Sequence, residues 1–518
     1  MHGYLFNRNM NGNKKIAKNT IIVYAQLFIT IILNLVISRL VLLALGASDF
    51  GLYNVVGGIV GMFTFISASM AATTTRFLNF EMGKPDGNLN KIFNQSNVLH
   101  ISIAIFIFIL LESIGTYYIY NYLNVSAGKE FDAMFVFQIS TIVACIGIIN
   151  VPYQAIFVAH EKFNIIALVD ISNVIIKFVV VICLLYYKGN ALRLYAVGMS
   201  ITTLFSFVVY HLMSKKKWPD IIRWQPVHNW KSYKEQLFFS NWNLLSTASL
   251  VGRSQGSAVL INLFFGTTVN AAYAIADMVL QQVNGFVGRF DTAVAPQITQ
   301  NIGSGNMDRS VYLASNTCRI CILVMITLFF TLFVELESVL RLWLGKVPEG
   351  ALVFCRYTLL IALVSSTAGG IAQLINGSGR IKWFKIQFAI WNLSPLLICY
   401  FLYLYGMQAQ YIVLLFVVAD VLNRITQLYL LNRLLQFNVK KYIKDAYVRP
   451  FIAFLVLTTY LLFYKSIHLT SCVNAIVGIV VTLFFSSMVC FYIGFQKNER
   501  HRLISLVKNG TDKLRRRF

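Results

Sequence analysis

The sequence predicts an all-α membrane protein with about fourteen transmembrane helices, arranged as two parallel six-helix bundles and two additional C-terminal helices. Three observations favour this class. The 518 residues are 57% hydrophobic and 12% charged, about half the charged share of a soluble protein. Apolar runs of about 20 residues, enough to cross a hydrocarbon core, recur along the chain. Corresponding segments of its two halves lie at a constant distance in the sequence.

Fourteen apolar runs are the predicted spans, and they lie near 19–46, 52–78, 98–121, 132–158, 163–187, 191–213, 238–265, 270–300, 311–335, 351–376, 383–405, 409–432, 447–464 and 472–495. Grouping them by the segments between them predicts six regions. These are a tail at 1–18, a first bundle at 19–213, a basic linker at 214–237, a second bundle at 238–436, two further helices within 437–496, and a basic tail at 497–518.

The distribution of basic residues predicts that both termini are cytoplasmic. Cytoplasmic loops of membrane proteins carry an excess of Lys and Arg. Most of the 44 basic residues fall on the side of the N-terminus, and the opposite side holds only Lys129, Lys188, Arg193, Arg341, Lys346 and Lys465. The net charge of +24 lies in loops and tails between apolar runs, so we expect anionic lipid headgroups, and not nucleic acid, as its partner.

An internal repeat relates the two halves. The segment from Gly46 to Tyr53 has its counterpart from Gly266 to Tyr273, at an offset of 220 residues. The same offset carries the start of each later span of the first half to the start of a span in the second. Because six spans separate the copies, both halves start on the same side, which is a parallel repeat. Such repeats place a cavity between the halves and permit alternating access.

Polar residues inside the eighth predicted span form one helical face. They follow helical spacing and are Asp277, Gln281, Asn284, Gly288 and Asp291. Charges at membrane depth cost about 2.5–3.5 kcal/mol on insertion scales, so they face a cavity or a partner. We therefore expect this face to line a cavity or a packed polar seam. The alternative is that Arg289 and Asp291 only pair with neighbouring helices.

Arginines within the spans are the candidate anion-binding residues. Arg39, Arg253 and Arg289 lie in the first, seventh and eighth spans, and Arg76 lies at the inner mouth of the second. A guanidinium donates paired hydrogen bonds to phosphate without losing its proton. For Arg76, a simple anchoring role on the cytoplasmic side is an equal alternative.

Motifs for covalent chemistry are missing from the sequence. It contains no nucleophile–base constellation, no metal-ligand spacing and no nucleotide-binding loop, so we expect no catalytic residue, metal or cofactor. Cys318 and Cys321 form a C-x-x-C pair without a second pair, which favours ordinary helix-lining cysteines.

Three stretches carry a family resemblance: Phe50–Gly58, Thr73–Leu78 and Gln282–Thr299. They resemble the Wzx-type flippases of O-antigen and capsule biosynthesis, in the superfamily that includes multidrug-extrusion (MATE) transporters. The resemblance covers essentially the whole chain and implies a MATE-like fold in the bacterial inner membrane. It also implies transport of an undecaprenyl-diphosphate-linked oligosaccharide, a repeat unit of O-antigen, capsule or exopolysaccharide, from the cytoplasmic to the periplasmic leaflet. The essential arginines of lipid II flippases cannot be mapped onto this chain, which disfavours that substrate.

The predicted function is therefore a flippase whose substrate contacts include Arg39, Arg76, Arg253, Arg289, Gln281 and Asn284. Without a nucleotide site, the energy is expected to come from an ion gradient, the membrane potential or consumption of the product outside. Asp170, Asp277 and Asp291 are the candidates for ion coupling. Membrane lipids and other proteins of polysaccharide assembly are further expected partners. Two alternatives remain: a cation-coupled multidrug antiporter of the MATE type, and an integral-membrane polysaccharide polymerase or glycosyltransferase. The longest outer loop, about residues 335–349, is too short for a catalytic domain.

Overall fold

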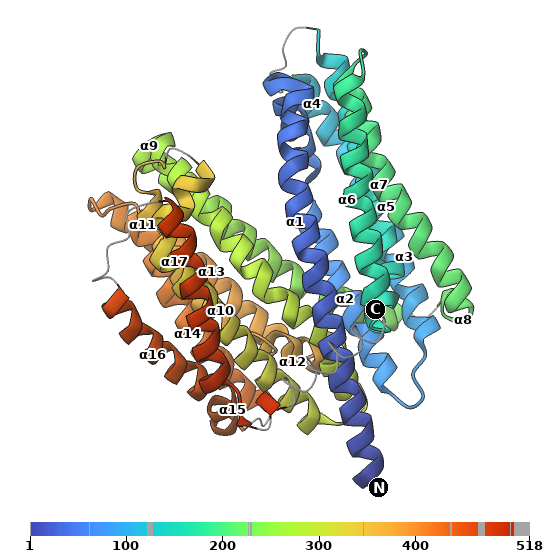
Figure 1. Cartoon of the computed structure of the whole chain (residues 1–518). Helices are drawn as coiled ribbons and strands as arrows, with labels where there is room; N and C mark the ends of the chain where they lie inside the picture. Colours follow the sequence, from blue (N-terminus) through green and yellow to red (C-terminus); the bar gives the residue numbers. More distant parts are fainter. Residues whose placement is uncertain are drawn as a thin grey trace, which may run out of the picture. The chain divides into compact units, whose positions relative to one another are not determined.

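The computed structural model describes residues 2–501 apart from 62, 122–127, 226, 228–229, 345–346, 436–437, 465–471 and 498. These residues form helices and, within the described ranges, no strand (Figure 1). The all-α prediction is confirmed. Most of the predicted basic tail, and Lys346 and Lys465, lie outside the described residues. The chain divides into two compact units, a first unit of residues 1–248 and 299–306 and a second unit of residues 249–298 and 307–518.

The helices of the first unit are α1 (His2–Gly61), α2 (Thr64–Gly83), α3 (Leu89–Leu110), α4 (Thr116–Asn121), α5 (Glu130–Ala159), α6 (Phe163–Tyr186), α7 (Ala191–Lys217) and the short α8 (Pro219–Ile222). A π-helical turn, Leu111–Gly115, joins α3 to α4. Helix α1 packs along α6, and α5 packs against α2, α3 and α7 (Figure 1). A core around Phe93, Phe157 and Tyr210 fills the space between these helices.

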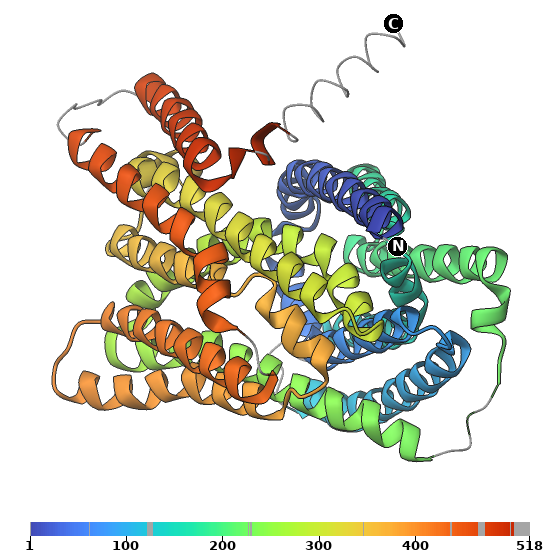
Figure 2. The ribbon, with the colours of Figure 1, turned by 90° about the horizontal axis from the view of Figure 1, so that it is seen from below.

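Helix α9 (Trp230–Gly303) contributes to both units, and the second unit then continues with α10 (Met307–Leu344), α11 (Ala351–Ser366), α12 (Ile371–Ser378), α13 (Lys382–Leu404), α14 (Tyr411–Leu435), α15 (Val439–Ala446), α16 (Val448–Tyr464) and α17 (Cys472–Gly494). Helix α10 contacts α11, α16 and α17 (Figure 2). Its side chains are the most buried of the unit's long helices because neighbours surround it.

Two long helices contain the same glycine kink. Gly46 in α1 has φ 72° and ψ 170°, and Gly266 in α9 has φ 79° and ψ −176°. A positive φ is costly for a residue with a side chain, so glycine is the residue that permits this backbone. The two kinks lie 220 residues apart, at the positions where the sequence repeat places corresponding turns.

Each of the fourteen predicted spans overlaps helical segments of the structure. Nine helices of the described residues are long and apolar enough to cross a membrane, or ten when the bent pair α11 and α12 counts as one span. Helix α2 and both halves of α9 are too polar for this criterion, and α16 is 17 residues long. The protein is thus a multi-pass membrane protein, and the number fourteen stays a prediction.

Candidate functional site

A cavity of about 330 Å³ lies inside the second unit, between α9, α11 and α14. Four of the predicted site residues line it: Arg253, Asp277, Gln281 and Asn284. They reach one cavity because α9 runs back along itself after the kink at Gly266, so that residues before and after the kink contribute together. The predicted polar face of the eighth span therefore faces a cavity at these three positions, 277, 281 and 284.

Asp277 is the carboxylate of this cavity. Its Oδ2 accepts hydrogen bonds from Ser254 Oγ at 3.2 Å and from Gln281 Nε2 at 2.9 Å. Gln281 is one helical turn from Asp277, so the helix itself positions this amide. The carboxylate is held in place by hydrogen bonds and is not paired with a cation among the described residues.

Arg253 is held by an ion pair. Its Nη1 and Nη2 donate to the two carboxylate oxygens of Asp420 at 3.0 and 3.1 Å, and Nη1 also donates to Asn392 at 3.1 Å. The guanidinium lies 4.1 Å from the ring centre of Phe416, which also lines the cavity. Because both arms of the fork are occupied, Arg253 orders the wall of the cavity and its charge is compensated there.

Asp291 does not line this cavity. Its carboxylate accepts from the Gly370 backbone N–H at 2.8 Å and from Gln373 Nε2 at 3.0 Å. Gly370 precedes α12, so Asp291 satisfies a backbone donor at the break between α11 and α12, where the chain bends by 48°. A carboxylate at a helix N-terminus is favoured by the exposed N–H groups and the helix dipole. This geometry favours the alternative that Asp291 has a structural partner.

Asp170 lies in α6 of the first unit, where Gln26 of α1 donates to it. Arg76 of α2 is surrounded by aromatic rings, with its guanidinium 4.6 Å from the ring centres of Phe77 and Phe80 and 5.2 Å from that of Phe239. Such cation–π contacts stabilise a partly buried guanidinium. Both residues therefore lie within the packing of the first unit.

Arg39 and Arg289 differ from Arg253. Arg39 is exposed on α1 and, together with Val36, Leu40 and Leu43, lines an open hollow. Arg289 is half-buried on α9. Within the described part of the chain, neither arginine has an ion pair or a hydrogen bond to an acceptor. They belong to different units, and their convergence stays a prediction.

Sequence reasoning missed three residues of this site: Asp420, Asn392 and Phe416. A signal for Asp420 is present, because Asp420, Asn423 and Gln427 follow helical spacing inside the otherwise apolar span 409–432. The carboxylate also has the charge that an arginine at membrane depth needs. No local pattern marks Asn392 or Phe416, which reach Arg253 only through the packing of α9 with α13 and α14.

Solved structures of transporters share this fold. A multidrug resistance MATE family transporter of the MOP superfamily in an outward-facing conformation matches with TM-score 0.72 at 13% identity, over 83% of this chain and 96% of that one. A MATE structure in the straight conformation matches with TM-score 0.67 at 17% identity, over 83% and 97%. A MOP superfamily transporter from Pyrococcus furiosus, described as having a binding pocket of reverse polarity, matches with TM-score 0.67 at 15% identity, over 83% and 97%.

These matches show that the chain has the MATE-like fold, and the predicted fold of two repeated bundles is confirmed. The model of one family, described as polysaccharide biosynthesis protein, matches residues 16–302. The chain belongs to this polysaccharide biosynthesis protein family, and the resemblance to Wzx-type transporters is confirmed. Its family and fold are those of a transporter and not of an enzyme. No curated protein sequence matches the chain.

Proposed function

We propose that this protein is a flippase that moves a polyprenyl-diphosphate-linked oligosaccharide from the cytoplasmic to the outer leaflet of a bacterial inner membrane by alternating access. Membership of the polysaccharide biosynthesis family supports a glycan as cargo. The observation that carries the proposal is the chemistry of the cavity in the second unit. Amide, hydroxyl and carboxylate groups line it beside the ring of Phe416, and its arginine is already neutralised by Asp420.

This set of groups suits a sugar. A sugar ring presents hydroxyls that both donate and accept, and apolar C–H faces that pack on an aromatic ring. Gln281 and Asn284 offer donors and acceptors, and Asp277 offers acceptors. A compensated Arg253 adds no net charge, so a neutral glycan is not disfavoured there.

Arg39 of the first unit and Arg289 of the second are then, each within its own unit, candidate contacts for the diphosphate. Their guanidinium groups have no competing carboxylate among the described residues, unlike that of Arg253. A diphosphate supplies the anionic partner that such groups lack at membrane depth. Arg76 has the aromatic contacts described above and is a secondary candidate.

Ion coupling is assigned to Asp277 within this proposal. It is the carboxylate that lines the cavity, so a bound cation or proton would share space with the cargo. Asp291 and Asp170 remain candidates, but neither lines this cavity. Asp277→Asn preserves the shape of the side chain and removes the charge. We expect it to abolish the dependence of export on an ion gradient while leaving glycan binding within a few fold.

The decisive experiment measures surface glycan in a strain that lacks its own flippase. Gln281→Ala and Asn284→Ala are expected to reduce export at limiting expression, and Arg39→Ala to reduce it more than Arg39→Lys, because lysine keeps the charge but loses the fork. Gln255→Ala, on the same helix but outside the cavity lining, is the matched control. The site assignment is wrong if Gln281→Ala, Asn284→Ala and Arg39→Ala all export glycan normally while present in the membrane in normal amounts.

The multidrug antiporter is the second candidate function, because the chain shares its fold with multidrug MATE structures and has a carboxylate in its cavity. It predicts efflux of organic cations that depends on Asp277. Production of this protein in a strain without drug pumps separates the two functions. If the protein is a flippase, we expect no gain of resistance to organic cations; if it is an antiporter, we expect a gain.

A further inference from the structure

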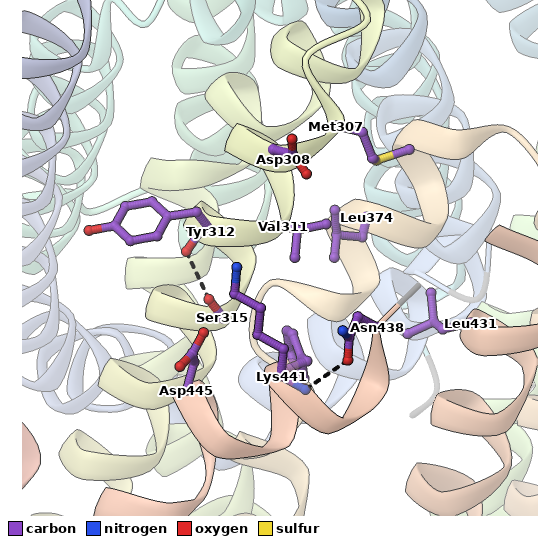
Figure 3. A pocket seen from close by; sticks show the side chains of 11 residues that line it. Met307, Asp308, Val311, Tyr312, Ser315, Leu374, Leu431, Asn438, Lys441 and Asp445 are labelled. Atoms are coloured by element: carbon purple, nitrogen blue, oxygen red, sulfur yellow. Dashed lines mark hydrogen bonds between the residues drawn. The ribbon is translucent and has the colours of Figure 1, made fainter. Parts of the chain in front are cut away.

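A second cavity, of about 560 Å³, lies in the second unit where α15 packs beside the start of α10 (Figure 3). It is distinct from the cavity around Asp277, and the two share no lining residue. One side of its lining is apolar and includes Met307, Val311 and Leu431. The other side is charged and includes Asp308, Lys441 and Asp445.

The predicted spans place this cavity at the boundary between membrane and water. Val311 begins the predicted span 311–335, and Leu431 is one residue from the end of the predicted span 409–432. Helix α15 follows directly and has two faces: Tyr442 and Ala446 are buried, whereas Lys440 and Lys444 are exposed. Short amphipathic helices with basic polar faces lie in the plane of the headgroups.

The three charged side chains of the cavity do not form ion pairs with one another among the described residues. Lys441 and Asp445 are four residues apart on one helix, a spacing that permits an ion pair. Even so, none of the ion pairs among the described residues involves Lys441, Asp445 or Asp308. Figure 3 shows the Lys441 side chain extending from α15 toward α10, between Asp308 and Asp445 in that view.

We propose that this cavity binds the headgroup of a phospholipid that carries both a primary ammonium and a phosphate. Lys441 would contact the phosphate, and Asp308 and Asp445 would accept hydrogen bonds from the ammonium. The apolar side, with Val311 and Leu431, would contact the start of the acyl chains. Asn438 caps α15 through the Lys441 backbone N–H at 3.0 Å, which fixes the helix end that presents the lysine.

The charge balance selects among lipids. Two carboxylates and one ammonium give the lining a formal charge of −1, which disfavours an anionic headgroup that has no cation of its own. A quaternary ammonium such as choline satisfies the charge but donates no hydrogen bond. A phosphoethanolamine headgroup satisfies both the acceptors and the lysine. This selectivity does not depend on what the protein transports.

Native mass spectrometry of the intact protein in detergent tests the selectivity. The probes are phosphatidylethanolamine, phosphatidylcholine and phosphatidylglycerol with identical acyl chains, each titrated against the delipidated protein. We expect phosphatidylethanolamine to bind roughly fivefold tighter or more than the other two, on the scale of one charge-assisted hydrogen bond. Equal binding of the three lipids would overturn the proposal.

Three variants separate the contacts. Asp445→Asn is expected to remove most of the preference for ethanolamine over choline. Lys441→Gln is expected to weaken binding of all three phospholipids, because each carries the phosphate. Lys440→Gln removes a neighbouring charge that does not line the cavity and is the matched control. Asp308 also lies in the first turn of α10, where a carboxylate stabilises the helix, so Asp445 is the cleaner probe.

A competition arm distinguishes a lipid from a soluble ligand with the same chemistry. Free phosphoethanolamine is added to the complex with phosphatidylethanolamine. The proposal expects little displacement, because the soluble compound lacks the chains that contact the apolar side. Displacement at concentrations equal to those of the lipid would mean that the occupant is a soluble phosphorylated amine, and it would refute the lipid assignment. Unchanged selectivity in Asp445→Asn, together with unchanged affinity for the three lipids in Lys441→Gln, would place the lipid elsewhere and refute it as well.

Discussion

Gly83 and Gly303 occupy equivalent positions in the two repeats and pack against each other through their backbones. A Cβ atom added to Gly83 would lie 2.0 Å from the carbonyl oxygen of Gln300, and one added to Gly303 would lie 2.1 Å from that of Phe80. Gln300 is itself the repeat counterpart of Phe80, 220 residues later. The contact is therefore reciprocal, and both partners belong to the first unit. Small residues permit such close approach of helices in membranes.

The first prediction concerns this glycine contact. Gly83→Ala and Gly303→Ala should each destabilise the protein by about 1–3 kcal/mol, the range for overpacking, because the clash is with backbone and cannot be relieved by a rotamer change. Thermal unfolding of the purified protein in detergent measures the effect. Gly147→Ala is the control, since a Cβ there meets nothing within 4 Å. Equal melting of Gly83→Ala and Gly147→Ala would show that the contact is loose.

The second prediction concerns the Arg253–Asp420 pair. The two side chains are 14% and 11% exposed, so removal of one partner leaves a poorly solvated charge, at a cost of about 3–5 kcal/mol. Arg253→Met and Asp420→Leu should each be strongly destabilising, and the double variant should be less so than the sum. A double-mutant cycle on unfolding in detergent measures this coupling. Additive effects would contradict the ion pair.

The third prediction concerns the break between α11 and α12. Asp291→Ala removes the acceptor of two hydrogen bonds, to Gly370 N and to Gln373 Nε2. Gln373→Ala removes only the second, so it should be milder. Each lost bond is expected to cost about 1–3 kcal/mol, because a partner is left unsatisfied: the Gly370 N–H and the Gln373 amide in Asp291→Ala, and one carboxylate oxygen of Asp291 in Gln373→Ala. Hydrogen exchange of the Gly370 amide should rise in Asp291→Ala but not in Gln373→Ala. If hydrogen exchange of the Gly370 amide is unchanged in both variants, Asp291 does not stabilise the break between α11 and α12.

The fourth prediction concerns topology. Lys129 and Arg193 are predicted to be outside, and both contact Asp132, at 3.8 and 2.6 Å, so the structure places them together. Lys129→Cys and Arg193→Cys should react with a membrane-impermeant thiol reagent in intact cells. Lys84→Cys, Lys216→Cys and Lys440→Cys should react only after permeabilisation. Labelling of Lys216→Cys in intact cells, without labelling of Lys129→Cys, would reverse the orientation.

The helices and the repeat could be predicted from the sequence because both depend on local composition and constant spacing. The glycines at 46 and 266 illustrate this, since their equivalence follows from the offset alone. The partners of the charges could not be predicted. The sequence suggests a ligand for Arg253, but this arginine pairs with Asp420 across 167 residues of sequence. Such pairing depends on which helices pack together, and a single sequence does not show this directly.

Asp277 and Asp291, on one helix, also show that the sequence does not predict what a charged side chain contacts. Both lie on the predicted polar face of the eighth span. Asp277 lines a cavity, whereas Asp291 meets the backbone at Gly370. Helical spacing places two residues on one face, but what the face meets changes over the length of a span. The break at residues 367–370, which decides the role of Asp291, has no strong signal beyond the pair Gly369–Gly370.

The Arg253–Asp420 pair has a consequence for biogenesis. The ribosome adds Asp420 only 167 residues after Arg253, which at about 5–20 residues per second is roughly 8–33 s later. During that interval the guanidinium is in or near the bilayer without its carboxylate, and an arginine at mid-membrane costs about 2.5–3.5 kcal/mol on insertion scales. The helix that carries it is therefore committed to the membrane before its countercharge exists. Truncated chains that end before residue 420 should be the ones that cells recognise and degrade.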